Sequence, residues 1–134
     1  MLVKDLMTTY ISSVSPDDPS SAVIRIMQSE DVGIVPVCDI QSHVLGVITD
    51  RDMIMRAHAN KTAGEIMTTP VFTADIKEDV HQAALRMAEC GVRRLPVLEN
   101  EKLAGMLSLR DLARKRIYIA EIGHIIYDIC NKNN

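Results

Sequence analysis

Aromatic side chains are scarce in this sequence, which has no tryptophan, one phenylalanine and three tyrosines among 134 residues. Proteins that bind single-stranded nucleic acid stack bases on aromatic rings, so the scarcity argues against that class. Charge of one sign is not in excess either, because the formal net charge is -3. A mildly acidic chain is a poor general binder of polyanions. We therefore expect no nucleic-acid partner.

Cysteines are also few, and Cys38, Cys90 and Cys130 form no Cys-x-x-Cys pair. Cys38 and Cys90 stand in apolar runs and are interpreted as small buried side chains, which fits a reducing, cytoplasmic location. No apolar run approaches the length of a membrane span, and residues 1–10 show no secretion signal. No histidine has a histidine or cysteine partner four residues away, so we expect no metal site.

What the sequence does contain is an internal repeat. Met7-Thr8-Thr9 returns as Met67-Thr68-Thr69, an offset of 60 residues, and Gly46 to Asp52 returns as Gly105 to Asp111, an offset of 59. With 47% hydrophobic residues the chain can bury an aliphatic core, but neither copy can bury its apolar face alone. We place the repeats at residues 1–59 and 60–116 and a tail at 117–134.

Each repeat has the periodicity of strand, helix, strand, strand and helix, which predicts mixed α/β packing with a small sheet per repeat. Helices are expected to begin near Ser20 and after Asp79, a suitable N-cap. The expected strands Ile34–Cys38 and Leu95–Leu98 each hold a proline, which is typical of an edge or irregular strand. In the tail, helical spacing predicts an amphipathic helix that packs on its own subunit or faces a partner, with the apolar positions Ile119, Ile122, Ile126 and Ile129.

The two repeats agree best in their polar residues at the junction between the last strand and the last helix. Thr49 and Asp52 in the first repeat correspond to Ser108 and Asp111 in the second, a hydroxyl-x-x-acid pattern. One interpretation is a helix cap close to the capping box. The other is a ligand site, because such a junction offers a hydroxyl and backbone N–H groups to phosphate and a carboxylate to a ribose diol.

Arginines near these junctions are consistent with an anionic ligand. Arg51 and Arg110 lie within the same turns and can bind phosphate with two parallel hydrogen bonds. Arg93 and Arg94 precede the strand that begins at Leu95, where the first repeat has Gly33-Ile34 instead. Because of this difference, the two sites should differ in charge. The alternative interpretation of the arginine pair is a solvated corner between helix and strand.

Together, the doubled Met-Thr-Thr motif, the Pro-Val strands and the Gly-x-x-(Thr/Ser)-x-Arg-Asp junctions resemble the tandem cystathionine-β-synthase (CBS) domain pair, or Bateman module. The resemblance covers about Val3 to Arg116. In particular, the chain resembles small stand-alone bacterial and archaeal CBS-pair proteins. It implies an α/β (α+β) fold in which two tandem β-α-β-β-α repeats pack with pseudo-two-fold symmetry, followed here by the C-terminal amphipathic helix.

The resemblance also implies two clefts between the repeats that bind an adenosyl ligand: AMP, ADP or ATP, with S-adenosylmethionine or NAD as further candidates. In both clefts the aspartate would hold ribose hydroxyls, and the hydroxyl residue and arginines would face phosphate. The first cleft, which we expect to bind phosphate more tightly, would be formed by Thr49, Arg51, Asp52, Thr69, Val71, Arg93, Arg94 and Leu95. The second would be formed by Ser108, Arg110, Asp111, Thr9, Ile11, Gly33, Ile34 and Val35.

The function implied is a non-catalytic regulatory module that senses energy state or a metabolite, with no catalytic residue, no required cofactor and no membrane association. The resemblance implies a homodimer and a separately encoded protein that it regulates. Two alternatives stay open. One is a structural or interaction adaptor with vestigial clefts, and the other is a nucleotide-processing enzyme, which would need a general base or metal near the phosphates.

Overall fold

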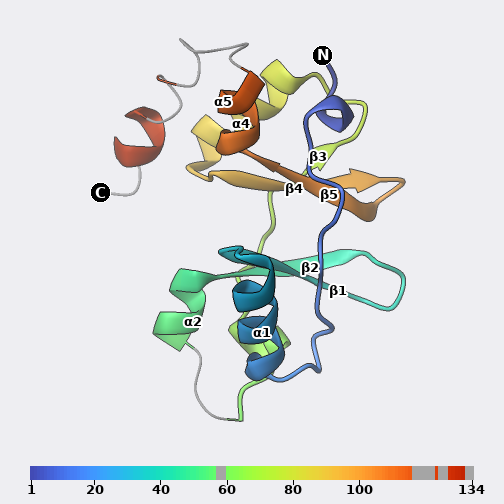
Figure 1. The fold of residues 1–134 in the computed structure, drawn as a ribbon, viewed down its shortest axis with the longest axis vertical. Helices are drawn as coiled ribbons and strands as arrows, with labels where there is room; N and C mark the ends of the chain where they lie inside the picture. The colour runs from blue at the N-terminus through green and yellow to red at the C-terminus, as the bar shows by residue number, and fades with distance from the viewer. Residues whose placement is uncertain (57–59, 116–122, 124–126, 132–134) are drawn as a thin grey trace. The chain divides into compact units, whose positions relative to one another are not determined.

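The computed structural model describes residues 1–56, 60–115, 123 and 127–131. They divide into two compact units (Figure 1). Unit 1 comprises Met1–Ile11, Phe72–Asn100 and Ala104–Asn134, and unit 2 comprises Ser12–Val71 and Glu101–Leu103. Each unit combines a small sheet with helices, so the mixed α/β class predicted from the sequence is confirmed.

Unit 2 is formed around an antiparallel hairpin. Strands β1 (Ile34–Cys38) and β2 (Val44–Thr49) pair with Val35 opposite Ile48, and Val14 adds a parallel bridge to Val37. Its helices are α1 (Ser20–Glu30), α2 (Asp50–Arg56) and α3 (Ala63–Ile66). The turn between the strands is closed by Asp39, whose Oδ1 accepts hydrogen bonds from the N–H groups of Gln41 and His43, both at 2.9 Å.

Unit 1 repeats this arrangement with a third short strand. Strands β3 (Ala74–Asp75), β4 (Arg94–Glu99) and β5 (Lys102–Ser108) form a sheet in that order. The helices are the 3-10 helix η1 (Val3–Asp5), α4 (Val80–Cys90) and α5 (Leu109–Lys115). Asp79 caps α4 by accepting from the His81 N–H, as predicted.

The predicted tail helix is described over residues 127–131. Ile129 is 1% exposed and belongs to the core of unit 1, so this turn packs on its own chain. The other three isoleucines of the predicted stripe, Ile119, Ile122 and Ile126, lie outside the described residues.

The prediction of an edge or irregular strand at each proline is right for β1, which has a register shift between Val37 and Cys38, whereas an edge position is wrong for β4. Strand β1 belongs to a two-stranded sheet, whereas β4 lies between β3 and β5. Proline has no N–H to donate, so in a strand with a neighbour on each side it removes one hydrogen bond of the sheet. Strand β4 tolerates Pro96 because β3 is short and pairs only with Val97 and Leu98.

The first segment of each repeat packs on the core of the other repeat. Val3 and Leu6 are buried with α4 in unit 1, and Ala63 and Ile66 are buried with α1 in unit 2. The backbone contacts match one by one: Val3 N–H donates to the Glu78 carbonyl at 2.9 Å, and Ala63 N–H donates to the Asp18 carbonyl at 2.8 Å. The compact units therefore differ from the sequence repeats by an exchanged segment.

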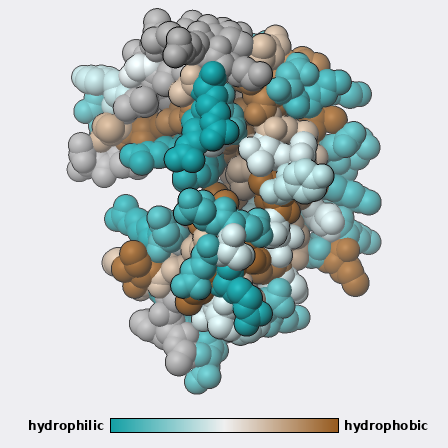
Figure 2. Space-filling view, viewed as in Figure 1, coloured by the Kyte–Doolittle hydropathy of each residue, from teal (hydrophilic) through white to brown (hydrophobic). Residues whose placement is uncertain are grey.

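Apolar side chains are buried in two separate clusters, one in each unit. Both are almost purely aliphatic, as the composition requires. Some apolar side chains remain outside, and Figure 2 shows brown atoms over α2, where Ile54 is 82% and Met55 67% exposed. Among the described residues, no helix combines the length and apolar character needed to cross a membrane.

Candidate functional site

The junction between β2 and α2 forms a reciprocal cap. The Thr49 N–H donates to Asp52 Oδ2 at 2.9 Å, and the Asp52 N–H donates to Thr49 Oγ1 at 3.1 Å. Each side chain thereby satisfies a backbone donor that the helix leaves unpaired. Of the two interpretations of the motif, the capping one describes what these atoms do in the structure.

Thr68 is a member of this site that the sequence analysis did not include. Its hydroxyl lies 2.9 Å from Asp52 Oδ1 and 3.0 Å from Oδ2, and its backbone pairs with Val47 in both directions, at 2.8 and 3.2 Å. Asp52 is only 8% exposed, and these donors compensate the burial of its charge. The duplicated Met-Thr-Thr motif was the available signal for Thr68, because Thr8 occupies the equivalent position in the other unit.

The junction between β5 and α5 repeats the cap with fewer contacts. The Ser108 N–H donates to Asp111 Oδ2 at 2.9 Å, and the Asp111 N–H donates to Ser108 Oγ at 3.2 Å. The Ser108 hydroxyl also reaches Asp111 Oδ2, at 3.0 Å. Thr8 pairs with Met106 through its backbone in both directions at 2.9 Å. Among the described residues, no hydrogen bond reaches Asp111 Oδ1.

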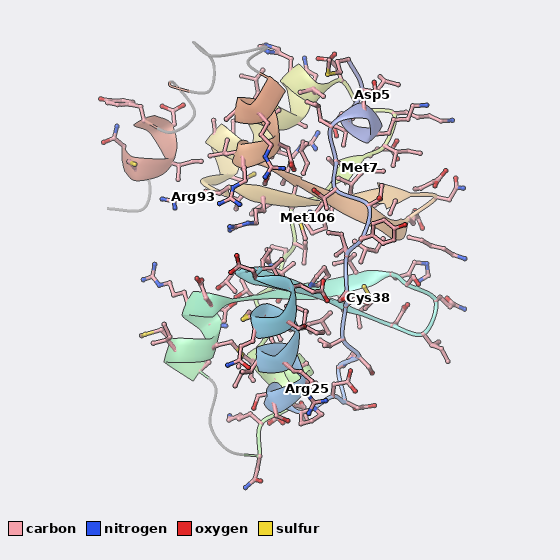
Figure 3. All side chains as sticks on the ribbon, in the orientation of Figure 1. Asp5, Met7, Arg25, Cys38, Arg93 and Met106 are labelled. Atoms are coloured by element: carbon pink, nitrogen blue, oxygen red, sulfur yellow. The ribbon has the colours of Figure 1, made fainter. Side chains whose placement is uncertain are left out.

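Glycines allow the exchanged segments to approach the second strand of each hairpin. A Cβ on Gly105 would lie 2.6 Å from the Thr8 carbonyl oxygen, and a Cβ on Gly46 would lie 2.6 Å from Met67 Sδ. Figure 3 shows Met7, beside Gly105, next to Met106 on β5. These close approaches accompany the pairing of Thr8 and Thr68 with their strands, and Thr68 also reaches the junction carboxylate of Asp52.

The beginning of the preceding strand is tied to each junction by one backbone hydrogen bond. The Asp50 N–H donates to the Gly33 carbonyl at 2.9 Å, and the Leu109 N–H donates to the Arg93 carbonyl at 3.1 Å. Three parts of each unit therefore converge: the exchanged segment, the strand-to-helix junction and the residues at the start of the first hairpin strand.

The predicted site residues divide evenly between the units. Unit 2 holds Thr49, Arg51, Asp52, Thr69, Val71, Gly33, Ile34 and Val35, and unit 1 holds Ser108, Arg110, Asp111, Thr9, Ile11, Arg93, Arg94 and Leu95. Val35 and Leu95 are 0% exposed and contribute their side chains to the cores. The predicted combinations of residues in the first and second clefts draw on both units and stay predictions.

Among the residues that the structure describes, the cysteines and the possible metal ligands form no comparable site. No cluster of three His, Cys, Asp or Glu side chains suited to a metal ion occurs in the described parts of the chain. Cys38 is buried, as predicted, whereas Cys90 is only partly buried. Burial raises the pKa of the Cys38 thiol, an effect that a hydrogen bond with Ser13 partly opposes. A thiol of this kind is a poor nucleophile.

Comparisons with known proteins agree with this architecture. The model of the CBS domain family matches twice, at residues 3–59 and 63–118. The CBS domain-containing protein YhcV of Bacillus subtilis is 31% identical over 136 residues, covering 98% of this chain and 96% of that protein.

Several solved structures are similar to this chain over most of their length. The crystal structure of Hypoxic Response Protein I with two coordinated zinc ions has a TM-score of 0.78 and 27% identity, covering 85% of this chain and 98% of that one. CBSX2 in complex with AMP has a TM-score of 0.76 and 25% identity, covering 89% and 98%. The CBS domain pair of MJ0100 in complex with 5′-methylthioadenosine and S-adenosyl-L-methionine has a TM-score of 0.76 and 25% identity, covering 86% and 94%. The doubled junction motif, the matched units and these similarities together show that the chain belongs to the CBS domain family and carries two CBS repeats.

Proposed function

We propose that this protein is a non-catalytic regulatory module that binds adenine nucleotides, AMP, ADP or ATP, and controls a separately encoded protein. The observation that carries the proposal is the pair of junction carboxylates, Asp52 and Asp111, each held in the same geometry by a hydroxyl residue three positions earlier. The ligands of CBSX2 and MJ0100 share an adenosine group, so ribose is the common element that such a carboxylate would bind.

The carboxylates retain capacity for a ribose diol. A carboxylate offers about four acceptor positions. Asp111 Oδ1 accepts nothing from the described residues, and Asp52 Oδ1 accepts only the Thr68 hydroxyl. Two ribose hydroxyls could therefore donate to these oxygens without breaking either cap. Val71 and Ile11, which follow the tethered threonines and are half-buried, supply apolar surface for an adenine ring.

The low exposure of Asp52 favours a second candidate, an interaction module in which both carboxylates act only as helix caps. Calorimetry with AMP, ADP, ATP, S-adenosylmethionine and NAD separates the two candidates. In the proposed function, Asp52→Ala removes one binding event and Asp111→Ala removes the other. Asp79→Ala is the matched control, because it also removes a helix cap, at α4, but lies at neither junction.

Either of two results would favour the interaction module: no heat with any ligand, or wild-type binding by both junction variants. Turnover of a nucleotide that disappears in Asp52→Ala would instead favour an enzyme.

Self-association belongs to the same proposal. The exposed Ile54 and Met55 on α2 are apolar surface that a homodimer could cover, and light scattering of the intact chain with Ile54→Lys tests this.

A further inference from the structure

The equivalent backbone hydrogen bonds of the two units carry side chains of opposite charge. In unit 2 the bond joins Asp50 to Gly33, and in unit 1 it joins Leu109 to Arg93. The acid of one unit thus corresponds to an apolar residue in the other, and the glycine of one corresponds to an arginine. Because the backbone geometry is the same, the two sites differ mainly in the charge that they present.

In unit 2 an acidic side chain covers the position where the other unit has an arginine. Asp50 Oδ2 lies 3.4 Å from where a Cβ on Gly33 would stand, and Asp50 Oδ1 accepts the Arg51 N–H at 2.8 Å. The carboxylate is therefore folded back over the glycine. Counting the two carboxylates of Asp50 and Asp52 against the guanidinium of Arg51, this junction carries a net charge of -1.

In unit 1 the same place is cationic. Arg93 and Arg94 lead into β4, and Arg110 lies in the first turn of α5, next to the residue that is bonded to Arg93. Figure 3 shows Arg93 at this corner, close to α5. All three side chains are exposed, and none has an ion-pair partner among the described residues. Three guanidinia against the carboxylate of Asp111 give a net charge of +2.

These charges act on the part of the ligand that lies beyond the ribose. Guanidinium groups bind phosphate through paired, charge-assisted hydrogen bonds. A carboxylate at the same place repels phosphate and attracts a cation, and added salt weakens such interactions between exposed charges. Adenine and ribose carry no charge, so both units can accept an adenosine group while they discriminate at its 5′ substituent.

We propose that the two CBS repeats select different adenosyl ligands: the unit 1 site takes a ligand that carries phosphate, and the unit 2 site takes one without phosphate, either neutral or cationic. This inference rests on the proposed function, because it assumes that both junctions bind adenosine. The specificity residues are Arg93, Arg94 and Arg110 in unit 1 and Asp50 in unit 2. It replaces the expectation that Arg93 and Arg94 belong to the cleft of Thr49 and Asp52 and make that cleft the tighter phosphate site, because the Arg93 carbonyl is bonded to Leu109, at the junction of Asp111.

AMP and adenosine are the probes, since they differ only in the phosphate. Each is titrated into Asp52→Ala, which leaves the unit 1 site, and into Asp111→Ala, which leaves the unit 2 site. Because hydrogen bonds to a charged group are stronger than neutral ones, we expect Asp52→Ala to bind AMP at least about tenfold more tightly than adenosine. Asp111→Ala should show the opposite preference, and raising the salt concentration should weaken only the AMP binding of Asp52→Ala.

Exchanging the charged residues between the units tests whether these residues determine the preference for AMP or adenosine. Gly33→Arg with Asp50→Leu, added to Asp111→Ala, should convert the unit 2 site to AMP preference. Arg93→Gly with Leu109→Asp, added to Asp52→Ala, should abolish the AMP preference of unit 1, so one exchange remains informative if the other variant does not fold. Arg25→Ala, which removes an exposed arginine from α1, is the matched control and should leave the AMP-to-adenosine ratio unchanged.

The outcomes separate the two proposals. If both single-site proteins prefer the same probe, or if a folded exchange variant keeps its original ratio, the selectivity proposal is overturned while adenosine binding stands. If neither probe, nor any other adenosyl ligand, binds the wild-type protein, the proposed function fails and the selectivity proposal fails with it.

Discussion

At the scale of single residues, Asp52 and Asp111 look equivalent in the sequence but accept different sets of hydrogen bonds in the structure. Asp52 accepts the Thr68 hydroxyl in addition to its own cap, whereas the hydrogen bonds of Asp111 within the described residues come from Ser108 alone. Removing a cap costs about 1 kcal/mol, and leaving a half-buried donor unpaired costs about 1–3 kcal/mol. We expect Asp52→Ala to lower the free energy of unfolding more than Asp111→Ala does.

Urea unfolding of both variants measures this difference. Thr68→Val, which removes only the hydroxyl, should account for most of it, at about 1 kcal/mol. Equal losses in the two alanine variants, or a Thr68→Val variant as stable as wild type, would show that the bond between Thr68 and Asp52 contributes nothing to stability.

The glycines of the second hairpin strands give a second paired prediction. A Cβ on Gly105 would collide with a backbone atom, the Thr8 carbonyl oxygen, whereas a Cβ on Gly46 would collide with the side chain of Met67. A methionine side chain can change rotamer, but the backbone of a paired segment can only move as a whole. Overpacking typically costs about 1–3 kcal/mol. We expect Gly105→Ala to lower the free energy of unfolding more than Gly46→Ala does, as measured by thermal and urea unfolding. The reverse order would contradict this.

Two surface carboxyls predict how stability depends on pH. Hydrogen bonds from the His43 backbone to Asp39 and from the Thr62 backbone to Glu65 lower the pKa of each carboxyl below its ordinary value, 3.8 and 4.5. Because the unfolded chain then binds protons more readily, the stabilisation is complete above the ordinary pKa and is lost as pH falls through the lower, folded pKa. Stability should therefore decline between about pH 5 and pH 3.

Glu65→Gln isolates one of these two contributions. Glutamine keeps the geometry of the capping box with Thr62 but does not titrate. Urea unfolding at pH 7 and pH 3 should show wild type more stable than Glu65→Gln at pH 7 and similar to it at pH 3. A difference that persists unchanged at pH 3 would mean that the charge of Glu65 is not involved.

At the scale of elements, the exchanged segments reverse the usual expectation of where a substitution acts. Leu6 lies in the first repeat but is buried with α4 of the second, and Ile66 lies in the second repeat but is buried with α1 of the first. Truncating a buried Leu or Ile to Ala costs about 2–5 kcal/mol. Leu6→Ala should therefore reduce amide hydrogen-exchange protection in α4 more than in α1, and Ile66→Ala should do the opposite.

Much of each element could be predicted from the sequence, because its cause is local. The apolar periodicity of α4, the Asp79 cap and the β-branched run of β1 depend on neighbours within a few residues. The middle position of β4 could not be predicted, because it depends on the strand β3 far away along the chain. The segment exchange was hidden for a related reason: an offset of 60 residues is the same whether a segment packs on its own repeat or on the other.

The candidate site also has some features that could be predicted from the sequence and others that could not. The pairing of Thr49 with Asp52, and of Ser108 with Asp111, follows from their spacing of three residues, and a helix cap was one of the two interpretations that this spacing allowed. The contact between Thr68 and Asp52 spans 16 residues and connects two elements, so no local pattern reveals it. The placement of Arg93 beside Leu109 also depends on strand pairing, which orders residues that are distant in the sequence.

At the scale of the whole molecule, the exchanged segment determines which fragment contains the core of unit 2, a unit of which only Glu101–Leu103 lie outside residues 12–71. Residues 12–71 hold α1, β1, β2, α2 and α3, together with every buried residue of the unit 2 core. Residues 1–60 hold the same helix α1 and hairpin but lack Ala63 and Ile66, and they carry instead Val3 and Leu6, whose packing partners are in α4. Both fragments have the same length, so size alone does not favour either one.

We expect the fragment 12–71 to fold, with a cooperative urea transition and dispersed amide resonances, and the fragment 1–60 to lack both. A domain of about 60 residues is only marginally stable, so the comparison between the two is the measurement, under identical conditions. Ile66→Ala in the fragment 12–71 should abolish its transition, since Ile66 is 0% exposed in the core. If 1–60 folds as well as 12–71 does, the exchanged segment is not a structural part of the unit, and each sequence repeat is the folding unit.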